Sequence, residues 1–405
     1  MRRNIVHPGA GKLKYEIREI VAFARSLNRW DIPIQWENIG DPVKKGEPVA
    51  SWIKDIVREK AGEDLSYAYS ETEGALGARE FLADLVHKRG KQIESGDILF
   101  FNGLGDAVAK IFGFLRREAR VLGPSPAYST LSSAEAAHSG YEHLTYRLDP
   151  DRDWMPDMED VELKVKYNDS IAGILLINPD NPTGAVYPVE VLKEFVRIAR
   201  IYGLFLICDE TYANIVYGGA KTAALSQVIE DVPGFALRSL SKEVPWPGAR
   251  CGWVEVYNRR ADHRFDSYIR SLVDAKRLEV CSTSLPQLCI PAIMGDPRYP
   301  EHLIRRAAIF EKRAEEAYAA FAGIEGISLK KPRGALYATA VFDPGILDDG
   351  RSRALPVREP SLAEFIQKQT AEVAPDKCFV YWLLASSGIC VVPLSGFASD
   401  LPGFR

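Results

Sequence analysis

Short apolar runs alternate with helical stretches from residue 51 to residue 256, and this alternation constrains the fold more than any other feature of the sequence. The runs IAGILLI and LFLIC, at 171–177 and 204–208, are almost continuously apolar, as expected for strands buried on both faces. Further strands are expected at 98–101, 235–240 and 251–256. Strand-then-helix alternation predicts an α/β fold, a three-layer sandwich with a mainly parallel sheet between two helical layers.

The remaining segments predict a second, smaller α+β domain. A chain of 405 residues is too long for one hydrophobic core. We expect residues 1–46 to contribute to the small domain, 47–295 to form the large domain and 296–405 to form the C-terminal small domain. The helices expected from apolar periodicity are 15–28, 51–60, 76–89, 106–117, 158–165, 299–321 and 362–374. The late strands expected are 327–331, 336–342 and 389–392.

Composition narrows the class of protein. Hydrophobic residues make up 46% and charged residues 26%, and no apolar run reaches the length of about 18 that a membrane helix needs. A net charge of −4 with scattered basic residues argues against a nucleic-acid partner. The six cysteines form no CxxC pair and the histidines form no ligand pattern, so no metal is expected. We expect a cytoplasmic protein with small-molecule partners.

The segment SLSKEVPWPGAR places Ser239, Lys242 and Arg250 after an apolar strand. A lysine amine with a lowered pKa condenses with an aldehyde, which makes Lys242 a candidate nucleophile. The planar fork of Arg250 is suited to a phosphate, with which it forms two charge-assisted hydrogen bonds. Taken alone, this pattern also fits a surface lysine.

Asp209 and Tyr212 lie in LFLICDETY, at the carboxyl end of a second apolar strand. Open α/β sheets bind ligands at this edge. A carboxylate there is suited to a pyridine nitrogen, which it would keep protonated so that the ring accepts electrons, and the tyrosine hydroxyl is suited to a phenolic oxygen of that ring. Asp209 alone also fits a loop cap or a magnesium ligand.

Two further side chains follow predicted strands. In INPDNPTG, two prolines and a glycine fix a turn that projects Asn181, whose amide can donate to a ring oxygen. In PSPAY, Tyr128 lies just beyond a strand, where it would either stack on an aromatic ring or pack in the core.

The segment FNGLGDAVAK places Gly103, Leu104 and Gly105 between a strand and a helix. Free amides at a helix N-terminus bind phosphate, although a simple glycine turn is the alternative. The segment is neither GxGxxG nor the ATP-binding pattern GxxxxGK[ST], which disfavours dinucleotides and ATP.

In this order, the motifs resemble the fold-type I aminotransferases that use pyridoxal 5′-phosphate (PLP), in the branch with aspartate, alanine and aromatic aminotransferases. The resemblance covers nearly the whole chain. Besides the segments above, it includes YEIRE (15–19), NIGDP (38–42), YSETEG (69–74), GALY (334–337) and ICVVPLSGF (389–397).

The resemblance implies a role for each matched residue. Lys242 would form the Schiff base with PLP, Asp209 would pair with the pyridine nitrogen, and Tyr128 would stack on the ring. Asn181 and Tyr212 would bond the phenolic oxygen. The residues implied for the phosphate are Gly103, Leu104, Gly105, Ser239 and Arg250, together with Tyr69 from a second subunit. An obligate homodimer is therefore implied.

The resemblance also implies a carboxylate site for the substrate, formed by Gly40, Asn181 and Arg405. Family members usually continue past this arginine, so the chain is expected to end early, and a terminal residue frays unless it is tied down. The substrate side chain is not assigned. Arg270 and Arg277 are candidates that also fit solvated helix charges, and Trp36, Tyr67 and Tyr337 fit either a side-chain pocket or a core.

The function implied is a ping-pong transamination, in which a small α-amino acid gives its amino group to a 2-oxo acid, with 2-oxoglutarate as the expected acceptor. A PLP-dependent carbon–sulfur β-lyase shares the same cofactor site and is the alternative. A PLP-binding regulatory domain is a remote alternative, because only 37 residues precede NIGDP and they are too few for a DNA-binding domain.

Overall fold

The computed structural model describes residues 4–13, 15–347 and 354–405. Within these residues the strands form one large sheet and two small ones. The large sheet has eight strands in the order β2-β9-β8-β7-β6-β3-β4-β5. Their bounds are β2 Ile98–Phe101, β3 Arg120–Ser125, β4 Thr145–Asp149, β5 Met155–Pro156, β6 Ile171–Ile177, β7 Phe205–Asp209, β8 Gly234–Ser239 and β9 Gly252–Tyr257.

The centre of the large sheet is parallel, as the sequence predicts. Strand β3 pairs in parallel with β4 and β6, and β6-β7 and β7-β8 are also parallel. Strand β9 is antiparallel to both β2 and β8, and β5 is antiparallel to β4. The mainly parallel α/β sheet is confirmed. Because β6, β7 and β8 run in the same direction, their carboxyl ends meet at one edge.

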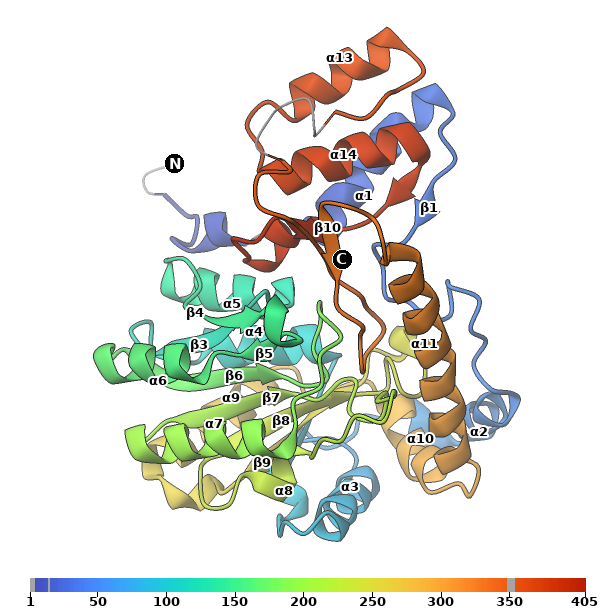
Figure 1. The fold of residues 1–405 in the computed structure, drawn as a ribbon. Coiled ribbons are helices and arrows are strands. Elements are labelled where there is room, and N and C mark those ends of the chain that lie inside the picture. The colour runs from blue at the N-terminus through green and yellow to red at the C-terminus, as the bar shows by residue number, and fades with distance from the viewer. Residues whose placement is uncertain (1–3, 14, 348–353) are drawn as a thin grey trace.

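Helices cover both faces of this sheet (Figure 1). One face packs on α4 Leu104–Gly113, α5 Ser129–Ser139 and α9 His263–Arg277. The other face packs on α3 Leu76–Lys88, α6 Met158–Tyr167, α7 Val189–Tyr202, α8 Leu225–Val228 and α10 Ser284–Met294, and α2 Ser51–Ala61 lies against α10. Trp253 and Phe100 are fully buried on this second face, where their rings lie 5.9 Å apart.

Helices from the two ends of the chain come together away from the large sheet (Figure 1), and their side chains form a separate hydrophobic cluster. It joins α1 Glu16–Ser26 with α13 Pro360–Gln369 and α14 Pro375–Ser387. Strand β1 Gln35–Trp36 pairs with β12 Ile389–Cys390, and β10 Ile327–Leu329, β11 Ala340–Phe342 and β13 Gly403–Phe404 form the third sheet. The long helix α11 Tyr299–Phe321 leads into this unit. The domain boundaries stay predictions.

Three predicted elements differ by more than two residues at one end from the structure. Helix α4 begins at Leu104 and ends at Gly113, not at 106 and 117, so both glycines of its first turn lie at the helix start. The helix predicted at 362–374 ends at Gln369, and Pro375 begins the unpredicted α14. Of the strand predicted at 336–342, only 340–342 pairs with neighbours. No helix among the described residues is long and apolar enough to span a bilayer.

Candidate active site

Three neighbouring parallel strands deliver polar side chains to one edge of the large sheet. Asp209 is the last residue of β7 and Ser239 the last of β8, while Asn181 lies in the turn after β6. The strand register pairs Ile177 with Asp209 and Asp209 with Leu237, so these strand ends are adjacent. The parallel topology therefore places the residues that the sequence singled out beside one another.

Asp209 is buried, and one of its oxygens is already occupied. Its Oδ1 accepts hydrogen bonds from the backbone amide of Thr211 at 3.0 Å and from the Thr211 hydroxyl at 2.6 Å. Burial raises the pKa of Asp209, whereas Thr211 and the nearby Lys242 charge lower it. No partner is found for Oδ2 in the part of the chain that the structure describes, which leaves this oxygen for a cationic N–H group.

A pair of tyrosines closes the site over Gly40. The hydroxyls of Tyr212 and Tyr337 lie 2.9 Å apart, and their rings meet edge to face at 82°. A Cβ atom on Gly40 would lie 2.1 Å from the Tyr337 hydroxyl, so only glycine fits there. Tyr337 is thus the one of the three candidate pocket aromatics that the structure brings to the other site residues.

Lys242 lies in the loop after β8, and its Nζ donates a hydrogen bond to the Gly40 carbonyl. Its charge also acts on the tyrosine pair. Although burial raises the pKa of Tyr337, the positive charges of Lys242 and Arg405 lower it, with a net shift below the usual value. The amine, Gly40 and Tyr337 therefore share one small volume next to Tyr212.

Arg405 is held firmly at the other side of Tyr337. Its backbone exchanges hydrogen bonds with Val392, at 2.8 Å from the amide and 3.1 Å to the carbonyl. Its guanidinium donates to Asn181 Oδ1 at 3.0 Å and to the Asn38 carbonyl at 2.7 Å, and lies 4.4 Å from the Tyr337 ring centre. The residue is only 7% exposed. The concern that a terminal arginine would fray does not apply to this structure.

Tyr128 extends the tyrosine cluster towards the N-terminal segment. Its hydroxyl lies 3.3 Å from the hydroxyl of Tyr15, which belongs to the YEIRE motif. Burial raises the pKa of Tyr128, and the neighbouring Tyr15 and Tyr337 hydroxyls add to this rise. The Tyr128 hydroxyl therefore remains protonated at neutral pH and is available as a hydrogen-bond donor.

Gly103, the first residues of α4 and Arg250 form a cradle for an anion. Gly103 has φ 85° and ψ 163°, a conformation essentially restricted to glycine. A Cβ there would lie 2.4 Å from a guanidinium nitrogen of Arg250. As the first residues of α4, Leu104 and Gly105 have amides without an intrahelical acceptor. Two free amides and a guanidinium at a helix N-terminus suit a phosphate.

Ser239 joins this cradle through the sheet. It pairs with Gly252 across β8 and β9, and a Cβ on Gly252 would lie 2.9 Å from the Leu104 side chain. The five residues that the sequence assigned to a phosphate therefore lie together. Ser239, the last residue of β8, lies three residues before Lys242, which places a phosphate and the amine within reach of one ligand.

Five other candidates lie apart from this group. Tyr69 is 83% exposed, and Tyr67 is 81% exposed with its hydroxyl on the Ala61 carbonyl at 2.8 Å. Trp36 lies on β1 and is 37% exposed. The Arg270 and Arg277 side chains are exposed on α9, where they pair with Asp266 and Asp274. Within this one chain, none of the five reaches the site.

Thr211, Asn38 and Tyr15 are site residues that sequence reasoning missed. Thr211 carried a signal, because a threonine two residues after a strand-end aspartate commonly bonds that carboxylate. Asn38 contributes only its carbonyl, and its contact with Arg405 spans most of the chain, so no local pattern predicts it.

Comparisons with known proteins agree with this geometry. A family model described as aminotransferase class I and II matches residues 38–405. An uncharacterized aminotransferase of Methanocaldococcus jannaschii is 53% identical over 406 residues, which cover 100% of this chain and 94% of the relative. The glutamate-pyruvate aminotransferase AlaA of Escherichia coli is 29% identical over 333 residues, or 81% of this chain and 80% of the relative.

A solved structure gives the same picture for the fold. The alanine aminotransferase from Pyrococcus furiosus superposes with a TM-score of 0.84 at 25% sequence identity. The superposition covers 100% of this chain and 94% of that one.

Proposed function

The chain belongs to the family of class I and II aminotransferases and is a transaminase, and we propose that it works with PLP bound between Lys242 and the anion cradle. The observation that carries this proposal is the joint placement of a lysine amine, a buried carboxylate and a phosphate-sized anion cradle at adjacent strand ends. The donor set fits the cofactor group by group, as the following contacts indicate.

The site offers suitable residues for both the phosphate and the ring of the cofactor. The cradle of Gly103, Leu104, Gly105, Ser239 and Arg250 supplies amides, a hydroxyl and a guanidinium for the phosphate. Asp209, with Oδ2 open, would pair with the pyridine nitrogen. Tyr212 and Asn181 would donate to the phenolic oxygen, and Tyr128 would stack on the ring. Such an arrangement fixes the cofactor at both ends before substrate arrives.

PLP supplies an aldehyde carbon and a pyridine ring that accepts electrons from the substrate Cα. Asp209 favours that chemistry, because a buried carboxylate stabilises a positive charge on the ring nitrogen better than water does. The substrate amine would displace the Lys242 amine, which would then take the proton from the substrate Cα. It would return this proton to the cofactor carbon bonded to the transferred nitrogen. Tyr212 and Tyr337, whose hydroxyls lie 2.9 Å apart, would shield this amine from water once the cofactor is bound.

Arg405 would bind the substrate α-carboxylate through the guanidinium N–H groups that do not bond Asn181 and Asn38, assisted by Asn181 and Gly40. The relatives named for alanine and for glutamate-pyruvate transfer favour alanine as donor and 2-oxoglutarate as acceptor. Since one site serves both reactants, the first product leaves before the second substrate binds, which is a ping-pong sequence.

The carbon–sulfur lyase alternative loses support, because the relatives that match across most of the chain are named aminotransferases. The regulatory-domain alternative loses support for the same reason. Neither reading has an observation in this structure that favours it.

We also propose a homodimer in which Tyr69 of one chain completes the phosphate site of the other. Tyr69 is 83% exposed, and exposed apolar residues lie in the segments around it. Two hydrogen bonds join this region to residues 278–284: Thr72 Oγ1 donates to the Val280 carbonyl at 3.0 Å, and Ser284 Oγ donates to the Ala68 carbonyl at 2.7 Å. Leu278, which is 88% exposed, therefore lies nearby. Exposed apolar residues on neighbouring segments are typical of a protein interface.

The proposed reaction has a direct test. The purified protein, incubated with PLP and single amino acids, should convert L-alanine to pyruvate when 2-oxoglutarate is present, with parallel lines in double-reciprocal plots at varied acceptor. Product formation without any acceptor would indicate elimination instead. Absence of amino transfer with every donor and both 2-oxoglutarate and pyruvate as acceptors would contradict the proposal.

The cradle gives a second prediction, for Gly103→Ala. The added Cβ meets Arg250 and forces a strained backbone, so PLP should bind about tenfold to hundredfold more weakly. Fluorescence titration of the PLP-free protein measures this Kd. Gly113→Ala is the matched control, because it lies in the same helix with no atom within 4 Å of its Cβ. Equal affinity in both variants would exclude Gly103 from the phosphate site.

A further inference from the structure

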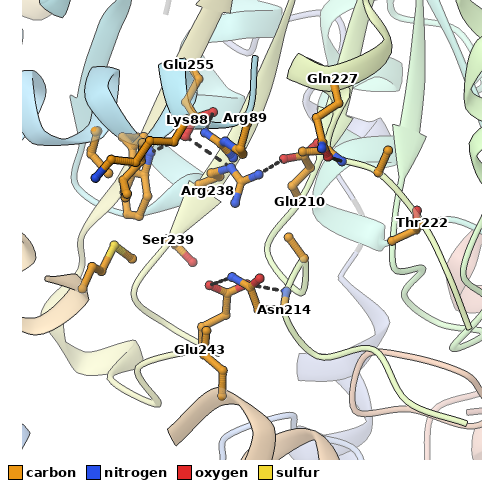
Figure 2. A pocket seen from close by; sticks show the side chains of 18 of the residues that line it. Lys88, Arg89, Glu210, Asn214, Thr222, Gln227, Arg238, Ser239, Glu243 and Glu255 are labelled. Atoms are coloured by element: carbon orange, nitrogen blue, oxygen red, sulfur yellow. Dashed lines mark hydrogen bonds and ion pairs between the residues drawn. The ribbon is translucent and has the colours of Figure 1, made fainter. Parts of the chain in front are cut away.

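A cavity of about 490 Å³ lies behind the end of β8 (Figure 2). Arg238, Ser239, Glu243 and Asn214 line it, and Arg238 and Glu243 lie on opposite sides. Glu243 directly follows Lys242 in the sequence. The cavity therefore borders the loop that carries the reactive amine.

Glu243 and Asn214 form a two-point contact across this loop. Glu243 Oε1 accepts from the Asn214 backbone amide at 2.8 Å, and Oε2 accepts from the Asn214 side-chain Nδ2 at 2.9 Å (Figure 2). Asn214 lies two residues after Tyr212, in the segment that follows Asp209. The contact thus ties the segment of Lys242 to the segment of Asp209 and Tyr212.

The main chain of Glu243 is held as well. His302 of α11 donates from Nε2 to the Glu243 carbonyl at 2.9 Å. Burial lowers the pKa of His302, and the Arg305 and Arg306 charges lower it further, so the ring is neutral at neutral pH. Glu243 is therefore fixed by its side chain from one segment and by its backbone from a helix.

The buried carboxylate at this position needs an explanation, because burial of a charge is costly unless it is well bonded. Glu243 is 5% exposed, and burial raises its pKa, while Arg238 and Asn214 lower it. Arg238 is already paired with Glu210 and lies 3.3 Å from Glu255. An apolar side chain at this position would be buried at a lower desolvation cost. What the carboxylate adds is the pair of hydrogen bonds to Asn214.

We propose that Glu243 is a positioning residue for Lys242, which acts by clamping the lysine loop to the Asp209–Tyr212 segment through Asn214. The inference rests on the proposed role of Lys242 in moving the Cα proton. The only hydrogen bond found for the Lys242 amine within the described residues is to the Gly40 carbonyl. The position of the Lys242 backbone therefore largely determines the position of its amine. A misplacement of about 1 Å can cost about a hundredfold in rate.

The first experiment replaces Glu243 with alanine in the PLP-loaded enzyme. We expect kcat to fall about tenfold to hundredfold, while KM for L-alanine changes less than about threefold, because proton transfer is impaired and binding is not. The kinetic isotope effect with α-deuterated L-alanine should rise, since proton transfer becomes rate-limiting. Unchanged kcat and isotope effect in a folded Glu243→Ala protein would overturn the proposal.

Matched variants separate position from charge. Glu243→Gln keeps both contacts, because its oxygen accepts from the Asn214 amide and its nitrogen donates to a flipped Asn214 side chain. It should stay within about threefold of the parent in kcat. Equal losses in the Gln and Ala variants would contradict a positioning role. Lys88→Ala, on the rim of the same cavity, is the control and should leave kcat and the isotope effect unchanged.

The cavity allows a rescue test. Because Glu243 borders open space, formate should enter the Glu243→Ala protein, restore the contact with Asn214 and partly restore both kcat and the isotope effect. If the Glu243→Ala protein fails to fold, Asn214→Ala takes its place. It should show a smaller fall in kcat and a smaller rise in the isotope effect, because the hydrogen bond from the Asn214 backbone amide survives. An Asn214→Ala protein with parental kcat would overturn the clamp. The parent enzyme tests the proposed function, because it must transaminate L-alanine. The variants then test the clamp alone.

Discussion

Replacing Lys242 with alanine is expected to lower kcat by about 10⁴-fold or more, because the variant loses both the group that bonds the cofactor and the group that moves the proton. The fold should survive, since the side chain is only partly buried and its sole hydrogen bond found in the described residues is to the Gly40 carbonyl. Steady-state transamination of L-alanine measures the rate, and circular dichroism checks the fold.

Two further variants sharpen this prediction. Lys242→Arg retains the positive charge but cannot deprotonate, so it should be as inactive as the alanine variant. Lys276→Met removes a fully buried amine, which donates to the Ser282 hydroxyl at 3.0 Å and whose pKa burial lowers. That variant should keep its visible absorption with PLP. Turnover near the parental rate in Lys242→Ala would show that another group performs the chemistry.

Replacing Arg405 with lysine is expected to raise KM for the amino donor by about 30-fold or more, with a smaller effect on the affinity for PLP. Lysine lacks the planar fork that bonds Asn181 Oδ1 and the Asn38 carbonyl while facing a carboxylate. The KM values for L-alanine and for 2-oxoglutarate should rise together, because both α-carboxylates use the same site.

Arg270 and Arg277 provide the matched controls for Arg405. Their side chains are 69% and 65% exposed and pair with acidic neighbours on α9. Arg270→Gln and Arg277→Gln should leave KM for both reactants unchanged. A large rise in the KM of either variant, with a normal KM in Arg405→Lys, would move the carboxylate site away from Arg405.

The sequence predicted the ranges of five of the eight strands in the large sheet, and the reason is physical. Strand β2 and helix α11 have the predicted bounds, because the first is apolar throughout and the second has a regular amphipathic period. Helix α14 was missed because it is buried on most sides and its apolar residues show no such period. Periodicity predicts an element only where one face meets water.

Some residues of the candidate site could be predicted from local patterns, and others could not. Asp209, Asn181 and Ser239 were predictable, because strand ends in a parallel sheet meet at one edge. The contacts of Tyr337 with Gly40 and Arg405 depend on how distant segments of the chain pack together, which no local pattern encodes. The clamp between Glu243 and Asn214 was not predictable for the same reason, although both residues adjoin predicted motifs.

The most direct measurement of the central claim is to identify the lysine that bonds PLP. The purified protein is loaded with PLP, reduced with borohydride, digested and analysed by mass spectrometry. We predict a phosphopyridoxyl adduct on the peptide that contains Lys242, lost in the Lys242→Ala protein while the Lys276→Met protein retains it. An adduct on Lys276 or on any other lysine, with Lys242 unmodified, would contradict the account.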